Sequence, residues 1–461
     1  MIDVTIIGAG ISGLTAAWQL KQQGLGVVVL ERQQCAGGNA ISENINGFLM
    51  EHGPSTINAA VPEVGKLSTA VGLTAAKVEL GDDVKRRYLV KNDQLHGISV
   101  HPLGFLLSNY LSLSGRARML FENIASSKKY QADETVDQYF TRRFGKQFAK
   151  RIMDPLVGGL YAGRADRISV QSVFPKVLEL EKKYGSISKG VWSRYLDQGS
   201  MPAKKLYSWR DGIGSFPKAL SQVLHDHIRT GVVVRKVRAC GSGFMIDTGK
   251  HGILNTRTVL MATQPHVAAS LLENMTPIGA SVIAEISAPP LAVVFMGFKR
   301  EHVDHPLDGL GYLSASSENR AFTGVQFPST MFAGRAPKSH VSLTAYMGGA
   351  RHSDMGRMNE QDILELARLE FKDLLGTHGK SVVSKVRFWP RGIPQYTVGH
   401  QGRVDKIEKL SREIPGLFVT GNYLNGPSVG CCVAGACETA GRIHTFLNNS
   451  FSQKIKASVL G

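Results

Sequence analysis

The sequence has few cysteines and no long apolar run. Its five cysteines are an odd number without C-x-x-C or metal-type spacing, which argues against a disulfide framework and a metal centre and indicates a reducing compartment. No stretch reaches the roughly 18 apolar residues that cross a bilayer. A hydrophobic strand is predicted from Ile2 onward, so we also expect no signal or transit peptide. These absences predict a cytoplasmic protein that is soluble or attached to one membrane face.

Acidic residues are scarce relative to basic ones. The chain has 54 lysines and arginines against 37 aspartates and glutamates, which gives a formal net charge of +17. Such a balance attracts nucleic acid, acidic lipid or a polycarboxylate substrate. The basic clusters are dispersed and no nucleic-acid module is recognisable. We therefore expect contact with a membrane surface and an acidic substrate, and no nucleic acid.

Side-chain arrangements typical of catalysis are missing as well. The order of Ser, His and Asp residues favours no catalytic triad, and none of the 14 histidines has a metal-binding partner at i+4 in a convincing helix. We predict no metal site and nominate no catalytic acid or base. The chain does have 50 glycines, 43% hydrophobic residues and enough length for two or three domains.

The first positive pattern is a strand, a glycine turn and a helix. Residues 2–7 are apolar and run into G-x-G-x-x-G, which lets a pyrophosphate approach the amides at a helix N-terminus. A second strand at 26–30 ends in an acid, at a spacing from the last glycine close to the roughly 20 residues at which a carboxylate can bind an adenosine ribose. The predicted dinucleotide residues are Gly8, Ala9, Gly10, Ile11, Ser12, Gly13 and Glu31.

Two further turns indicate which dinucleotide is bound. A pair of glycines, Gly37 and Gly38, follows Glu31, the acid predicted to bind the ribose. A Gly-Pro turn at Gly53 and Pro54 comes later. This order resembles the FAD site of amine-oxidase-like flavoproteins, in which both turns close over the pyrophosphate and reach the flavin. The resemblance implies an FAD cofactor and adds these cofactor-binding candidates: Arg32, Gly38, Asn39, Gly53, Pro54, Ser55 and Thr56.

The strand pattern returns twice later in the chain. Short apolar runs lie at 231–237, 244–246 and 259–263, and another strand at 416–420 precedes a turn and a helix predicted from about Cys431 to Leu447. The N-terminus of that helix would favour the negative charge of a reduced flavin near N1 and O2. The cofactor candidates here are Gly421, Ser428, Val429, Gly430 and Val237, the last implied by resemblance to this flavoprotein class, in which such a strand contacts adenine.

The intervening segments differ in periodicity. Residues 101–207 are predicted helical, and the apolar helix expected at 102–113, followed by basic residues, could lie in a membrane interface or act as an internal lid. Residues 154–163 are predicted to be a glycine-rich passage between helices. Strands are expected at 291–298 and 341–347, with a helix at 360–375.

We therefore predict an α/β fold with three interleaved parts. A discontinuous Rossmann-like FAD-binding domain would comprise residues 1–80, 206–268 and 400–450. A sheet-based substrate domain would comprise 81–87 and 269–399. A helical domain that could bind a membrane would comprise 88–205.

Four motifs give the whole chain a family resemblance. They are the runs 155–163, 332–337, 346–350 and 389–400, the last reading W-P-R-G-I-P-Q-Y-T-V-G-H. In this order they resemble the oxygen-dependent protoporphyrinogen oxidase family. The resemblance implies a flavoenzyme of haem biosynthesis, often a dimer attached to one membrane face. It also leads us to expect that the product is handed over to ferrochelatase.

The resemblance also assigns substrate-binding roles. It places the propionate-binding arginine on Arg87, a substrate-facing glycine on Gly159, an aliphatic wall on Leu313 and a stacking aromatic on Tyr346, with Trp389 near the flavin. A guanidinium fork suits a carboxylate. The sequence departs from the pattern at Gln326, where plant-type members have leucine, and this amide affects how apolar the pocket wall is.

The implied reaction is oxidation of protoporphyrinogen IX to protoporphyrin IX. A methylene bridge would give hydride to flavin N5, and oxygen would reoxidise the flavin and form hydrogen peroxide. Three alternatives stay open at this point: oxidation of coproporphyrinogen III to coproporphyrin III, a flavin-containing tetrapyrrole carrier that passes porphyrin to a chelatase, and an amine oxidase.

Overall fold

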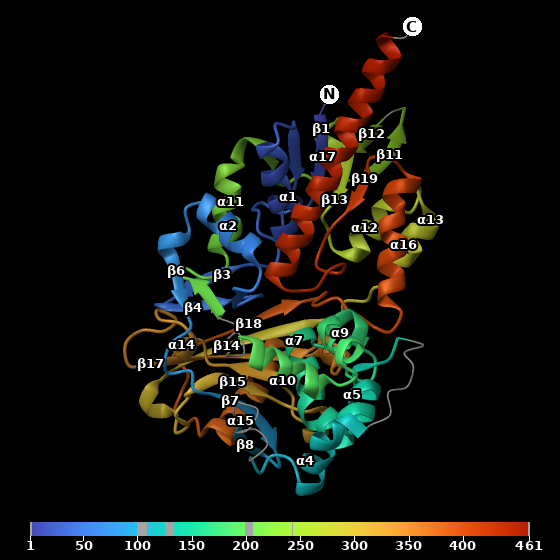
Figure 1. Cartoon of the computed structure of the whole chain (residues 1–461). Helices are drawn as coiled ribbons and strands as arrows, with labels where there is room; N and C mark the ends of the chain where they lie inside the picture. The colour runs from blue at the N-terminus through green and yellow to red at the C-terminus, as the bar shows by residue number, and fades with distance from the viewer. Residues whose placement is uncertain (1, 99–107, 125–132, 199–205, 242, 460–461) are drawn as a thin grey trace.

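The computed structural model describes residues 2–98, 108–124, 133–198, 206–241 and 243–459. A nucleotide-type sheet with its helices forms the upper part of Figure 1, and a second large sheet with a group of helices forms the lower part. The mixed α/β fold class predicted from the sequence is confirmed.

The first sheet has the order β10-β2-β1-β13-β12-β11, and β19 also pairs with β13. β1, β2, β10, β13 and β19 run parallel, so their carboxyl ends meet at one edge, where α/β sheets bind ligands. The bounds are β1 (Ile2–Ile7), β2 (Val27–Leu30), β10 (Ile228–Arg229), β11 (Lys236–Cys240), β12 (Gly243–Asp247), β13 (Ile253–Met261) and β19 (Leu417–Val419).

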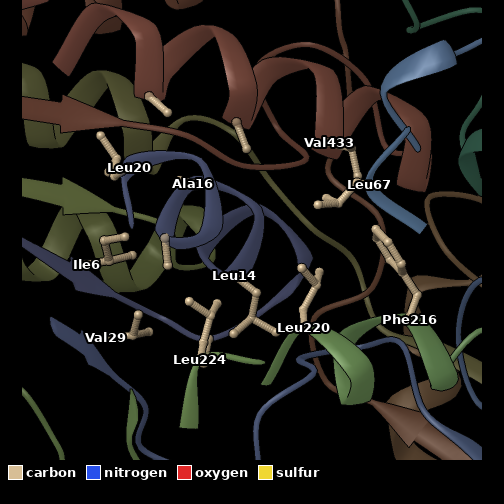
Figure 2. Close-up of a cluster of buried hydrophobic side chains, with 14 of the residues drawn as sticks. Ile6, Leu14, Ala16, Leu20, Val29, Leu67, Phe216, Leu220, Leu224 and Val433 are labelled. Atoms are coloured by element: carbon tan, nitrogen blue, oxygen red, sulfur yellow. The ribbon is translucent and has the colours of Figure 1, made fainter. Parts of the chain in front are cut away.

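Helices cover both faces of this sheet. On one face, α1 (Ile11–Gln22) lies between the sheet, α11 (Ser215–Val223) and α17 (Val429–Val459), and α2 (Pro62–Ala70) joins the same core. Figure 2 shows this core, in which Leu14 and Leu20 of α1 pack among Ile6, Leu220 and other apolar side chains. The other face is covered by α12 (Pro265–Leu272), α13 (Pro277–Ala284) and α16 (His400–Glu413). Burial of these apolar side chains stabilises the region in which the glycine turn lies.

Two small sheets connect the upper and lower parts. The hairpin of β3 (Ser42–Ile45) and β4 (Phe48–Glu51) packs on the lower sheet through Phe48 and Met50, which contact Phe295. The other small sheet has the order β5-β9-β6 and comprises β5 (Ile57–Asn58), β6 (Lys77–Glu79) and β9 (Leu206–Trp209).

The second large sheet has the order β18-β14-β17-β16-β15-β7-β8. One face packs on α15 (Glu360–Leu375) through a continuous apolar core. The bounds are β7 (Arg86–Lys91), β8 (Gln94–Ile98), β14 (Leu291–Lys299), β15 (Gly309–Leu313), β16 (Gly324–Gln326), β17 (His340–Gly348) and β18 (Val383–Trp389), with α14 (Pro328–Met331) beside them. The predictions of strands at 291–298 and 341–347 and of a helix at 360–375 are confirmed.

A group of helices lies over part of the opposite face of this sheet. A capping box fixes the start of α5, because Thr135 and Gln138 exchange hydrogen bonds. The bounds are α4 (Leu113–Leu120), α5 (Val136–Phe144), α6 (Lys146–Phe148), the π-helical η3 (Ala149–Met153), α7 (Asp154–Tyr161), α8 (Val170–Val173), α9 (Pro175–Tyr184) and α10 (Ile187–Gln198). Short 3-10 segments are η1 (Thr74–Ala76), η2 (Phe121–Ile124), η4 (His225–His227), η5 (Gly249–His251), η6 (Arg300–His302), η7 (Ser316–Glu318) and η8 (Ser353–Arg357).

Some predicted boundaries were wrong. Of the apolar helix expected at 102–113, residues 102–107 lie outside the described part of the chain, and the helix that follows begins only at Leu113, after its Ser112 N-cap. The expected passage at 154–163 is mostly helix, because a proline at the second helical position and the preceding π-helix start α7 directly. The helical domain was predicted from residue 88, but β7 and β8 extend the substrate sheet to Ile98.

Two further boundaries differ in the nucleotide-type part. The strand expected at 231–237 begins only at Lys236, since the preceding residues form a turn and an extended connection. The helix expected to end near Leu447 continues to Val459 and projects from the body of the molecule (Figure 1). Among the described residues, no helix combines the length and the apolar character needed to cross a membrane.

Candidate functional site

The predicted dinucleotide turn lies at the carboxyl edge of the first sheet. A Cβ atom on Gly13 would overlap the carbonyl oxygen of Gly8, and a Cβ on Gly8 would lie 2.6 Å from the carbonyl oxygen of Ala262. Both positions therefore require glycine for the close packing of α1 against β1 and β13. Ile11 and Ser12 form the first turn of α1, whose amides point toward this edge.

Gly10 and Gly38 form an open cradle beside that turn. The Gly37 amide donates to the Ala9 carbonyl over 2.8 Å, which brings the second glycine turn against the first. A Cβ on Gly10 would have Gly38 Cα, 3.9 Å away, as its nearest protein atom. The two glycine backbones thus face a space that no side chain fills, and a pyrophosphate fits such a space beside a helix N-terminus. Asn39 follows directly, and its carbonyl oxygen leaves no room for a Cβ on Gly53.

Glu31 lies at the end of β2 and is 8% exposed. Its carboxylate accepts hydrogen bonds from the amides of Ala9 and Gln33, each at 2.8 Å. A carboxylate has about four acceptor positions, so both oxygens retain capacity for ribose hydroxyls. Arg32 is exposed beside it, and Val237 packs in the same core as the ends of β1 and β2. The structure brings Glu31 and Arg32 to this edge, whereas Val237 lies on β11 and pairs through Ile246 with the start of β13. The roles of all three stay predictions.

The start of α17 lies beside the start of α1. Ser428 caps α17 by accepting a hydrogen bond from the Cys431 amide over 3.1 Å, and Gly430 packs against Val61 with no room for a Cβ. β19 and β13 are parallel neighbours, so the turn from Gly421 to Val429 leaves the same edge of the sheet. Two helix N-termini therefore direct their dipoles toward the predicted cofactor.

The Gly-Pro turn joins the two large sheets. Trp389 on β18 donates its indole Nε1–H to the carbonyl of His52 over 2.7 Å. Ser55 donates its hydroxyl to Gln326 Oε1 on β16 over 2.9 Å. Pro54 and Thr56 lie in this turn and are partly exposed. The predicted cofactor turn is therefore hydrogen-bonded to the second sheet at two strands.

The predicted substrate residues on the strands share one face of the second sheet. Side chains alternate along a strand, so residues next to core-facing ones point the other way. The core over α15 contains Tyr88, Tyr312, Val325, Ala345 and Met347. The predicted residues adjoin these and occupy the opposite face: Arg87, Leu313, Gln326 and Tyr346.

Hydrogen bonds and close contacts tie this face together. Tyr346 donates its hydroxyl to Gln326 Oε1 over 3.0 Å, so this oxygen accepts from both Tyr346 and Ser55. Gly159 of α7 faces Leu313 so closely that a Cβ would overlap Leu313 Cδ2. The structure thus brings Gly159 to the same face from the helical region.

Arg87 differs from the arginine that precedes it. Arg86 lies 3.5 Å from Asp308, whereas Arg87 forms no ion pair with any carboxylate in the described part of the chain. Arg87 is an exposed residue. Protein atoms around its guanidinium nevertheless remove part of its hydration, and this desolvation lowers its pKa. Arg87 therefore offers an uncompensated fork to an anionic ligand.

Sequence reasoning missed several polar residues beside this face. A small cavity is lined by Ser55, Gln326 and Tyr346 and also by Glu51, Arg335 and Thr344. Burial raises the pKa of Glu51 to about 7, although the Ser42 hydroxyl and the Ile213 amide, both bonded to it, lower it. Arg335 is 1% exposed. A charged residue inside an otherwise apolar strand, as in F-L-M-E, was the available signal for Glu51.

His400 ends the motif that carries Trp389 and is 1% exposed. Its ring lies 4.5 Å from that of Tyr396. Burial, helped by Arg403, lowers its pKa from 6.5 to about 4. An unfolded chain takes up this proton near pH 6.5 and the folded chain only near pH 4, so the histidine favours unfolding increasingly as pH falls through that window.

We expect the free energy of unfolding to fall as pH decreases from 6.5 to 4, by at most about 3 kcal/mol from this residue. A His400→Gln variant should have a flatter pH dependence in urea titrations followed by circular dichroism. His225, whose side chain is 73% exposed, provides the matched control, and His225→Gln should keep the wild-type slope. Equal slopes in all three proteins would show that His400 is protonated as easily when folded as when unfolded.

Comparison with known proteins gives relatives over nearly the whole chain. Protoporphyrinogen oxidase 2, chloroplastic/mitochondrial, of Arabidopsis thaliana is 28% identical, over 98% of this chain and 95% of its own length. Coproporphyrinogen III oxidase of Bacillus subtilis (strain 168) is 25% identical, over 93% of this chain and 95% of its own. The predicted likeness to the protoporphyrinogen oxidase family is thereby confirmed.

A solved structure gives the fold independently. A protein of Exiguobacterium sp. 255-15, provisionally named a protoporphyrinogen oxidase, superimposes with a TM-score of 0.84 at 21% identity, over 96% of this chain and 99% of that one. The family model described as "Flavin containing amine oxidoreductase" matches residues 11–444. The glycine cradle fits FAD, the cofactor predicted from the sequence. The chain belongs to the flavin-containing amine oxidoreductase family and is an FAD-dependent oxidoreductase.

Proposed function

We propose that the enzyme oxidises a porphyrinogen, with protoporphyrinogen IX as its substrate and protoporphyrin IX as its product. The observation that carries the proposal is the shared face of Arg87, Leu313, Gln326 and Tyr346, hydrogen-bonded through Ser55 to the cofactor turn. The face combines the Arg87 guanidinium, which has no carboxylate partner in the described part of the chain, with aromatic and aliphatic walls. A flat macrocycle with carboxylate side chains needs such a combination. The names of the relatives support the same substrate class.

Each residue has a distinct part in this proposal. Arg87 binds a propionate by a bidentate contact, and Tyr346 and Leu313 hold the ring between them. Gly159 lets Leu313 pack directly against α7, which fixes that aliphatic wall beside the ring. FAD would supply the hydride acceptor and the route by which electrons reach oxygen. The protein holds the substrate close to that cofactor and excludes water, and no strong base is required because a pyrrole N–H becomes acidic as its ring is oxidised.

Coproporphyrinogen III is the second candidate substrate, and two observations favour it. The formal net charge is +17, and the amide of Gln326 lies where plant-type members of the resembling family have a leucine. Both features suit a substrate with four carboxylates. Steady-state rates of the FAD-loaded enzyme with each porphyrinogen, read by porphyrin fluorescence, test the choice. We expect kcat/KM to be at least about tenfold higher with protoporphyrinogen IX; a preference for the tetracarboxylate would reverse the assignment.

The proposal includes contact with a membrane surface. Three large apolar side chains are exposed on α4 and η2, where Leu113, Leu120 and Phe121 have exposed fractions of 77%, 60% and 59%. Arg116 lies among them. Apolar side chains beside basic ones favour binding in the interface of an anionic bilayer.

We expect a Leu113→Ser/Phe121→Ser variant to lose most of the enzyme's binding to phosphatidylglycerol-containing vesicles in a co-sedimentation assay. The physical reason is the loss of buried apolar area. Ile278 is 82% exposed on α13, in the nucleotide-type part, so Ile278→Ser is the matched control and should bind like wild type. Equal sedimentation of all three proteins would argue against this surface.

A further inference from the structure

Asp154 and Arg351 form a buried ion pair between the helical region and the second sheet. Arg351 Nη2 lies 3.2 Å from the carboxylate oxygen Oδ2 of Asp154, and only 8% of the Asp154 side chain and 6% of the Arg351 side chain is exposed. Asp154 begins α7, and Arg351 follows the end of β17, the strand that carries Tyr346. Little water screens such a pair, so removal of either partner leaves a buried, uncompensated charge.

The pair also fixes the chain just after Leu313. Arg351 donates from Nη1 to the Ser314 carbonyl over 2.7 Å and from Nη2 to the backbone carbonyl of Asp154. The Asp154 carboxylate accepts from the Ser316 amide over 2.7 Å. The two charged side chains therefore connect α7, the end of β15 and the end of β17.

Gly158 and Gly159 lie one helical turn further along α7. Gly158 shares a helix face with Asp154, and a Cβ atom on it would lie 2.5 Å from Arg351 Nη2. The next residue, Gly159, meets Leu313. The guanidinium therefore occupies the space that Gly158 leaves, next to the glycine that meets Leu313.

The far end of α7 is attached to the same segment. The Ala350 amide donates to the Ala162 carbonyl over 2.8 Å, and Gly349 has no room for a Cβ beside that carbonyl. α7 is thus held at both ends by residues 349–351 and lies beside β15 (Figure 1). A change at Arg351 would move the helix relative to the sheet.

We infer that Asp154 and Arg351 are positioning residues that set how Gly159 packs against Leu313, and hence where the Leu313 wall of the substrate face lies. This inference rests on the proposed function, because it assigns the face that includes Leu313 to a flat porphyrinogen. The pair touches neither the predicted cofactor residues nor the substrate face directly. Its effect is therefore on substrate fit and leaves FAD binding unchanged.

The first test compares Arg351→Met with Asp154→Asn in the FAD-loaded enzyme. Each variant should raise the KM for the porphyrinogen by about tenfold, change kcat less than about threefold and retain full FAD. Arg368 pairs with Glu365 over 3.3 Å on the exposed side of α15, and Arg368→Met is the matched control with unchanged KM. A lower unfolding temperature with a wild-type KM would assign the pair a purely structural role and overturn the inference.

The second test uses the contact between Gly158 and Arg351. Gly158→Ala should push the guanidinium aside and raise KM to the same extent as Arg351→Met, and the double variant should show no further increase. Gly159→Ala acts on Leu313, so its effect should persist in the Arg351→Met background. If Gly158→Ala and Arg351→Met instead raised KM independently, so that their effects multiplied in the double variant, the two residues would not act through the same contact.

A binding measurement separates this inference from the proposed function. Protoporphyrin IX is titrated against wild type and Arg351→Met, and binding is followed by quenching of porphyrin fluorescence. If wild type binds porphyrin but oxidises no porphyrinogen, the proposed function fails, and a roughly tenfold weaker Kd in the variant still supports the positioning role. Equal Kd values in the two proteins would overturn the positioning role whether or not turnover is observed.

Discussion

Replacing Arg87 with alanine is expected to raise the KM for the porphyrinogen by roughly 10- to 100-fold, about 1.4 to 2.7 kcal/mol of binding. The guanidinium is exposed and has no carboxylate partner among the described residues, so its charge is available to a propionate. Arg87→Lys keeps the charge but loses the fork and should give an intermediate KM. The flavin spectrum and FAD content should match wild type, because Arg87 lies on β7 of the second large sheet and the glycine turn lies at the edge of the first. Steady-state kinetics with absorption spectra provide the measurement.

Arg86 is the matched control for this experiment. It is adjacent in sequence, equally charged, on the opposite face of β7 and 3.5 Å from Asp308. Arg86→Ala should change KM less than about twofold, since exposed ion pairs contribute little. An Arg87→Ala enzyme with wild-type KM, or equal effects of the two alanines, would place the carboxylate contact elsewhere.

Gly10→Ala is expected to weaken FAD binding by about 100-fold or more while the apoprotein unfolds at the wild-type temperature. The Gly10 backbone has φ −75°, which any residue adopts, so an alanine causes no strain. Its Cβ would meet no protein atom closer than Gly38 Cα at 3.9 Å. The methyl group would instead occupy the space in which we place the pyrophosphate. Fluorescence titration of apoprotein with FAD and calorimetry of the apoprotein measure the two quantities.

Gly13→Ala separates cofactor binding from folding. Its Cβ would overlap the Gly8 carbonyl oxygen, so this variant should lower the unfolding temperature of the apoprotein itself. The pair of variants thus distinguishes a glycine needed for the ligand from one needed for the helix. A Gly10→Ala protein that binds FAD like wild type would contradict the cradle.

The parts of the fold that depend on local periodicity could be predicted from sequence. The glycine turn, the helix after it and the strand ending before Glu31 follow from residues close together in the chain, and the structure has them at Ile11–Gln22 and Val27–Leu30. α7 was missed because its two adjacent glycines indicated a loop. Tertiary contacts with Arg351 and Leu313 require those glycines, so helix propensity was a poor guide there.

The substrate face depends on contacts between residues far apart in the chain. Ser55 and Gln326 are separated by 271 positions, and Arg87 lies near Leu313 only because β7 pairs in parallel with β15. No spacing in the sequence encodes that register, so these residues were predicted from family resemblance alone. In the sequence, Asp154 was marked only by an ordinary Asp-Pro helix start. Arg351 was marked only as a charged residue that follows a predicted strand.

Anaerobic mixing of the FAD-loaded enzyme with protoporphyrinogen IX tests the central claim most directly. An oxidase should lose the flavin absorbance near 450 nm as the substrate is oxidised, and admission of oxygen should restore it and yield porphyrin with hydrogen peroxide. Coproporphyrinogen III and a primary amine serve as comparison substrates in the same apparatus. A flavin that stays yellow with both porphyrinogens while porphyrin still binds would identify a carrier, and bleaching by the amine alone would identify an amine oxidase; either result would contradict the account.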